Sequence, residues 1–158
     1  MHLRPSLEPR EPDRETTQAL QALLTRLTGA GSVDAQTRAD LQTFQTRSGT
    51  SRTLDDFRSL RAGGEEALWA EIQYGLPPRV PDLKPAELAE LVARALAAFN
   101  QPARFHWYAK AIDRNVAMPQ ASDLFFFPPS DLAVSTVDYE PDPDDIVARI
   151  LAYQPLDP

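Results

Sequence analysis

The sequence contains no cysteine, only two histidines and no long run of apolar residues. Without cysteine, the chain has no disulfide, no thiol nucleophile and no cysteine-ligated zinc or iron–sulfur site. Its longest apolar stretches fall far short of the ~20 residues that span a bilayer, and its first residues lack the apolar core of a signal peptide. We therefore expect a soluble, cytoplasmic protein that needs no cofactor.

Common catalytic motifs are also missing. The chain has no glycine-rich phosphate loop, no Gly-x-Ser-x-Gly elbow and no His-Glu-x-x-His sequence. A histidine metal cluster is excluded because the only other histidine besides His106 is His2. The acidic residues within 138–145 lack the mid-loop glycine of a calcium loop. We predict that the protein is not an enzyme and holds no metal; the enzymatic alternative is metal-dependent chemistry at Asp113 and Asp123.

Proline and glycine divide the chain into two parts. All six glycines lie at or before Gly75, and no proline occurs between Asp13 and Leu76. Four prolines then follow within nine residues, which is typical of a connector. We predict a disordered terminus over residues 1–12, a helical region over 13–76, a proline-rich linker over 77–82 and a second domain over 83–158.

Apolar spacing predicts an all-α fold in both parts. In the first part, four leucines at helical spacing precede Gly29, and short helices are predicted around residues 34–46, 53–60 and 68–75. The second part predicts a long helix over 85–99, another over 102–118, a short aromatic helix capped by Ser122, and a last helix starting at Asp142. Phe99 and Leu151 belong to the predicted buried stripes. The expected architecture is thus a C-terminal four-helix bundle with a short third helix, preceded by a set of short helices.

The net charge of −7 is concentrated near the C-terminus. Residues 115–158 contain one basic residue, Arg149, and eight acidic ones. Such a segment repels nucleic acid and anionic membranes, and it attracts a basic partner. The simpler interpretation is that the charge serves solubility.

Three successive phenylalanines, Phe125, Phe126 and Phe127, are followed at once by proline. Neighbouring side chains on a helix point ~100° apart, so a one-turn helix does not bury all three rings on one face. At least one ring is therefore expected to be exposed and available for binding. In the alternative arrangement, Leu124, Phe125 and Phe127 fill the bundle and Phe126 rests on the loop over 129–141.

Two segments carry a resemblance to a known family. The segment Pro119–Pro128 reads Pro-Gln-Ala-Ser-Asp-Leu-Phe-Phe-Phe-Pro, and Asp142–Val147 reads Asp-Pro-Asp-Asp-Ile-Val. With the helix order above, these segments make residues 82–154 similar to the DNase colicin and pyocin immunity proteins, which are small acidic four-helix inhibitors. The family usually has tyrosine where this chain has Phe126 and Phe127.

The resemblance implies a function and a set of contact residues. In the family, the third helix contacts a cytotoxic nuclease and the second helix selects which nuclease is bound. The implied anchors are Asp123, Phe126 and Phe127, with Ser122 and Pro128 at the rim. The matching positions of the second helix are Phe105, His106, Ala109 and Asp113. We expect a basic nuclease toxin as partner, blocked at its substrate surface, or alternatively a helical adaptor that shares the fold and binds another protein.

Overall fold

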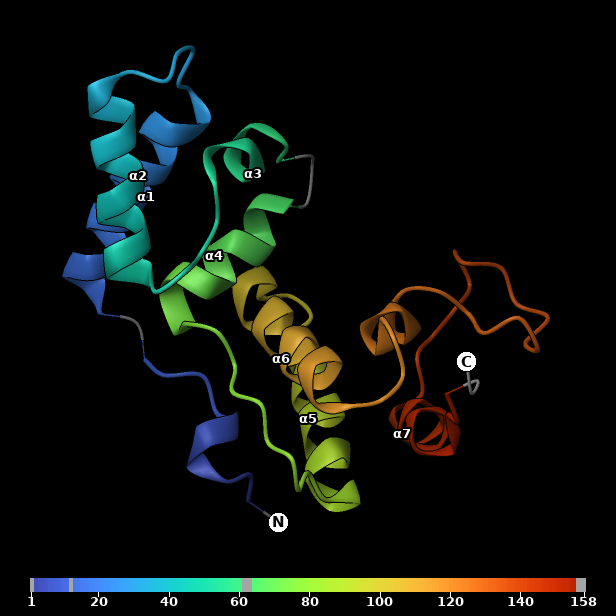
Figure 1. Cartoon of the computed structure of the whole chain (residues 1–158). Coiled ribbons are helices and arrows are strands. Elements are labelled where there is room, and N and C mark those ends of the chain that lie inside the picture. The colour runs from blue at the N-terminus through green and yellow to red at the C-terminus, as the bar shows by residue number, and fades with distance from the viewer. Residues whose placement is uncertain (1, 12, 61–63, 156–158) are drawn as a thin grey trace. The chain divides into compact units, whose positions relative to one another are not determined.

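The computed structural model describes residues 2–11, 13–60 and 64–155, and within these ranges it contains helices and no strand (Figure 1). The prediction of an all-α fold is confirmed. The chain forms two compact units, an N-terminal unit of Arg10–Leu76 and a C-terminal unit of Pro77–Pro158 together with Met1–Pro9. None of the described helices is both long and apolar enough to cross a membrane.

The N-terminal unit is built around α1 (Arg14–Thr28), which packs against α2 (Ala35–Ser48), α3 (Leu54–Arg58) and α4 (Gly64–Tyr74). The four leucines of α1 all face the core, as their spacing predicts. The buried cluster consists of Leu20, Leu23, Leu24, Leu27, Phe44, Phe57, Leu68 and Ile72.

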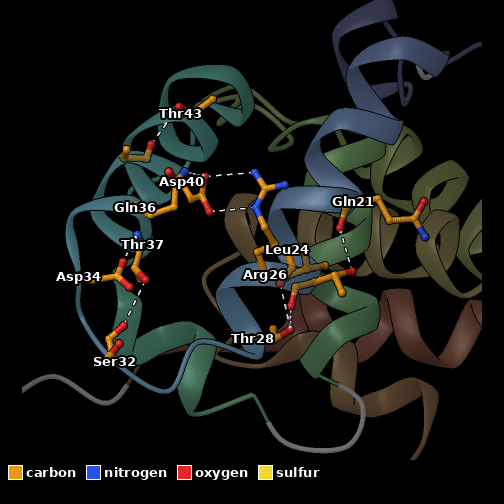
Figure 2. Close-up of polar contacts among 12 residues, drawn as sticks. Gln21, Leu24, Arg26, Thr28, Ser32, Asp34, Gln36, Thr37, Asp40 and Thr43 are labelled. Carbon is orange, nitrogen blue, oxygen red and sulfur yellow. Dashed lines mark hydrogen bonds and ion pairs between the residues drawn. The ribbon is translucent and has the colours of Figure 1, made fainter.

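Local signals set the ends of α2, and one ion pair joins it to α1. Asp34 caps the start of α2 by accepting the backbone N–H of Thr37 at 2.8 Å, and Gly49 ends the helix with a φ of 71°. Figure 2 shows Arg26 of α1 reaching the carboxylate of Asp40 on α2, at 2.9 and 3.1 Å. This guanidinium holds the pKa of Asp40 below its usual value.

The C-terminal unit contains α5 (Pro85–Ala97), α6 (Pro102–Asn115), the short 3₁₀ helix η2 (Ala121–Phe125) and α7 (Pro143–Ala152). The helix α5 packs against α6 and α7, and η2 packs against the same two helices. The predicted order of two long helices, one short and one medium helix is therefore present. Their buried side chains include Leu88, Leu91, Val92, Ala95, Phe105, Tyr108, Ile112, Phe125, Ile146 and Ile150.

Two residues expected in the buried stripes are exposed instead. Phe99 is 53% exposed because α5 ends at Ala97, and the following turn leaves the helical period that would have buried the ring. Leu151 is 54% exposed in the last turn of α7, beyond Ile150, the last buried residue of that helix. The helical period predicts burial wrongly in both places, because Phe99 lies beyond the end of α5 and Leu151 lies in the last turn of α7.

The first residues are packed against α5, so the expectation of a disordered terminus is wrong for residues 2–9. Leu3 and Leu7 are buried, and Pro5–Leu7 forms the 3₁₀ helix η1. Arg4 donates two hydrogen bonds of 2.7 Å to the buried carboxylate of Glu87, and Glu8 pairs with a residue of α5 as well. This N-terminal strap, residues 2–9, is thus fixed by apolar burial and charge together.

The proline-rich segment over 77–82 is also anchored and is not a free linker. Pro77 and Val80 are buried. The Asn115 side chain at the end of α6 accepts the backbone N–H of Val80 and donates to the Pro78 carbonyl at 2.9 Å. Because a side chain of α6 satisfies its backbone groups, the segment belongs to the C-terminal unit.

Replacing Arg4 by methionine is expected to lower the stability of the C-terminal unit near neutral pH. Arg4, together with the Lys84 backbone N–H, lowers the pKa of Glu87 to about 2. A carboxyl group with a depressed pKa stabilises the folded state above its unfolded pKa of 4.5, and this contribution is lost as pH falls towards 2. Urea unfolding between pH 7 and pH 2 should show this loss in the wild type and a smaller one in Arg4→Met.

The matched control for this prediction is Arg10→Met. Arg10 is exposed and has no ion pair within the described residues. The control should leave both stability and its pH dependence unchanged. Equal behaviour of the two variants would contradict the assigned role of Arg4.

Candidate protein-binding surface

Three exposed phenylalanine rings form a continuous surface on the C-terminal unit. Phe99, Phe126 and Phe127, here called the aromatic surface, are 53, 40 and 56% exposed. The ring centroids of Phe99 and Phe126 lie 5.9 Å apart, and those of Phe126 and Phe127 lie 6.5 Å apart. The buried ring of Phe105 supports Phe99 and Phe126 from below, at 5.3 Å from each. These edge and tilted contacts hold the rings without hiding them.

The backbone of η2 explains why the last two rings are exposed. Leu124 and Phe125 are buried, and the chain then turns, with the N–H groups of Phe126 and Phe127 donating to the Asp123 carbonyl at 3.0 and 2.9 Å. Proline follows at 128, so the chain does not continue as a helix beyond this turn. The prediction of at least one exposed ring is confirmed, and the alternative with a buried Phe127 is wrong.

Ser122 has a different role from the predicted helix cap. The helix η2 begins one residue earlier, at Ala121. The Ser122 backbone N–H and hydroxyl both donate to the carboxylate of Asp113, at 2.9 and 2.6 Å. In addition, the Tyr139 hydroxyl donates to the Leu124 carbonyl at 2.7 Å. These bonds attach η2 to α6 and to the loop before α7, so the aromatic surface has a defined position.

The positions implied on the second helix lie mostly beneath this surface. Phe105 and Ala109 are buried and offer little area to a partner, and the ring of Phe105 supports the exposed rings. His106 is half-buried, with its ring 5.7 Å from that of Phe105. Asp113 is half-buried and is engaged by Ser122. Its carboxylate positions η2 within the C-terminal unit.

Asp123 and Pro128 lie on the same short segment as the exposed rings. Asp123 is exposed, and its carboxylate makes no hydrogen bond or ion pair with any described residue. Pro128 is half-buried. The structure adds Phe99 to this group, which the sequence analysis placed in the core. The available signal was the end of α5 before Asn100 and Pro102, which interrupts the helical period at that point.

The negative charge near this surface is only partly neutralised. Arg149 binds Asp131 at 2.7 and 2.9 Å and Asp145 at 2.6 Å. Exposed acids without an ion pair in the described part of the chain include Asp123, Glu140 and Asp144. The C-terminal unit therefore presents free carboxylates together with exposed aromatic rings.

Among the described residues, no group of three or more histidine, aspartate or glutamate side chains is arranged to hold a metal ion. The two acids proposed for an enzymatic alternative, Asp113 and Asp123, lack a third ligand of this kind among the described residues.

The chain matches no protein-family model, no curated protein and no solved structure. The resemblance of residues 82–154 to the immunity proteins therefore stays a prediction from the sequence.

Proposed function

We propose that this protein neutralises a basic protein toxin, a nuclease domain of the bacteriocin type, by binding it through the aromatic surface and Asp123. The observation that carries the proposal is the combination of three contiguous exposed phenylalanines with the exposed carboxylate of Asp123, which pairs with no residue that the structure describes. A soluble domain rarely leaves such a group of rings in water, and buried aromatic anchors contribute much of the binding energy at protein interfaces.

The charge of the region adds long-range attraction to this contact. The excess of carboxylates over residues 115–158 accelerates the approach of a cationic surface. After docking, Asp123 pairs with a basic side chain, and lysine or arginine side chains lie over the phenylalanine faces. A nuclease needs its positive surface to hold DNA, so a partner seated there excludes the substrate by bulk and by charge.

The direct test uses the purified, catalytically inactivated nuclease domain of a toxin encoded beside this gene, or a panel of colicin and pyocin DNase domains where no such gene exists. Hydrogen exchange of the full chain should slow in residues 122–128 when the nuclease is added. DNA cleavage by the active domain should fall in parallel. Unchanged exchange in this segment together with unchanged cleavage would overturn the proposal.

Asp123→Asn is expected to weaken nuclease binding by roughly 1.5–3 kcal/mol, the usual contribution of a hydrogen bond to a charged group. The melting temperature should stay nearly constant because this carboxylate makes no bond with the described residues. Isothermal titration calorimetry and thermal unfolding measure the two effects.

The association rate of the wild type with the nuclease should also fall steeply as salt is added, because salt screens long-range attraction between charges.

Glu140→Gln provides the matched control because Glu140 is another exposed acid without an ion pair in the described residues. It should change the association rate slightly and the dissociation rate very little. Equal losses in the two variants would show that Asp123 contributes only to the overall charge.

A second candidate function, a helical adaptor, is favoured by the N-terminal unit. This unit has a complete core of its own, and the proposed nuclease contact uses none of its residues. In an adaptor, the principal partner would bind this unit, and nuclease domains would not protect residues 122–128 from exchange.

A further inference from the structure

The turn between α5 and α6 contains a pocket of about 280 Å³ whose lining differs from the aromatic surface. The polar side chains of its lining are two arginines, one glutamine and one tyrosine. No carboxylate is among the described residues that line it. The lining consists of Arg94, Ala97, Ala98, Gln101, Arg104 and Tyr108.

Arg94 is held in place at one wall of this pocket. Its Nε donates to Glu90 at 2.9 Å, and one Nη1 hydrogen bond of 2.8 Å reaches Glu8 of the N-terminal strap. Hydrogen bonding to Glu90 and to Glu8 raises the pKa of Arg94. Because a guanidinium carries five N–H groups, these carboxylates orient Arg94 and leave donors for a further acceptor.

Arg104 supplies a charge that no described residue neutralises. It lies in the first turn of α6, is half-buried and has no ion pair with the described residues. The positive end of the helix dipole lies at the same turn. Because Glu8 and Glu90 pair with Arg94, Arg104 is the guanidinium of the lining whose charge no described carboxylate offsets.

We propose that this pocket binds a small oxyanion, a phosphate or carboxylate group, between Arg94 and Arg104. Guanidinium groups bind planar and tetrahedral oxyanions through paired N–H groups, and a pre-oriented guanidinium loses less entropy on binding. The Tyr108 hydroxyl and the Gln101 amide add hydrogen-bond donors. The volume fits a phosphate ion or a short polycarboxylate, and it is smaller than the pockets that hold most drug-sized ligands.

The test is a titration of the full chain with inorganic phosphate and, in a separate arm, with citrate, both at constant ionic strength. Two-dimensional NMR should show saturable shifts centred on residues 94–108. Arg104→Gln should weaken this binding at least ~10-fold, which corresponds to ~1.4 kcal/mol. Arg104→Lys, which keeps the charge and loses the paired N–H groups, should fall between Arg104→Gln and the wild type.

Lys110→Gln is the matched control because it removes the same charge from an exposed position of α6 that does not line the pocket. It should bind as the wild type does. Saturation by phosphate alone or by citrate alone supports the site and identifies which oxyanion it prefers. Absence of saturable shifts in both arms would overturn the proposal, as would equal weakening by Arg104→Gln and Lys110→Gln in variants with an unchanged circular dichroism spectrum.

This inference is independent of the proposed function. Its residues are not members of the aromatic surface, and its probe is a small ion. Failure of the oxyanion titration would leave the nuclease proposal unchanged, and failure of nuclease binding would leave the oxyanion proposal unchanged.

Discussion

Phe127→Ala is expected to weaken nuclease binding by about 2–4 kcal/mol while the melting temperature changes little. Phe127 is 56% exposed, and its ring contacts that of Phe126 at a centroid distance of 6.5 Å. The backbone N–H of Phe127 binds the Asp123 carbonyl, so the turn does not depend on the side chain. Burial of the ring by a partner is therefore the main interaction that alanine removes. Calorimetric titration with the nuclease domain and thermal unfolding measure the two quantities.

Two further variants make this prediction specific. Val137→Ala shortens an apolar side chain that is 94% exposed in the same acidic region but outside the aromatic surface, so it should bind almost as the wild type does. Phe127→Tyr keeps the ring, introduces the tyrosine usual in the immunity proteins and should preserve binding. A large loss of stability in Phe127→Ala with intact binding would show that the ring supports the fold and is not a contact.

Phe44→Ala is expected to destabilise the N-terminal unit by about 3–5 kcal/mol. Phe44 is fully buried on α2, and its ring meets that of Phe57 edge to face with centroids 5.1 Å apart. Alanine leaves a cavity at the centre of the cluster and also removes this aromatic contact. Because all residues of this core cluster belong to the N-terminal unit, the C-terminal unit should unfold at the same urea concentration as in the wild type.

The chain offers a convenient readout for this prediction. It has two tryptophans, Trp69 in the N-terminal unit and Trp107 in the C-terminal unit. Fluorescence of Trp69, followed in a Trp107→Phe background, should shift to lower urea in Phe44→Ala. Fluorescence of Trp107, followed in a Trp69→Phe background, should not. A common shift of both signals would contradict the assignment of separate cores.

The same variant separates the two candidate functions. If the aromatic surface binds the nuclease, Phe44→Ala should keep its affinity under conditions in which the C-terminal unit is folded. If the protein is an adaptor that works through the N-terminal unit, its principal partner should be lost with that core. Phe44→Leu, which stays apolar and fills most of the space, should behave closer to the wild type in stability.

The sequence analysis predicted the members of the candidate site that lie close together in the chain and missed Phe99, which lies far from them in the chain. Asp123, Phe126 and Phe127 lie within one short segment, and the impossibility of burying three successive rings on one helical turn depends only on backbone geometry. Phe99 is distant in sequence from this segment, and its inclusion depends on where α5 stops and how α6 carries Phe105 beneath it. No periodic pattern contains that information.

The sequence by itself determined which segments are helical and where several of these helices begin or end, because capping, proline and glycine act on neighbouring residues. Asp34 and Asp142 accept backbone N–H groups at the starts of α2 and α7, and Gly75 ends α4 with a φ of 74°. Only the tertiary structure decided that the N-terminal strap belongs to the C-terminal unit. Arg4 and Glu87 are 83 residues apart in the chain, and opposite charges this distant pair only when folding brings their backbones together.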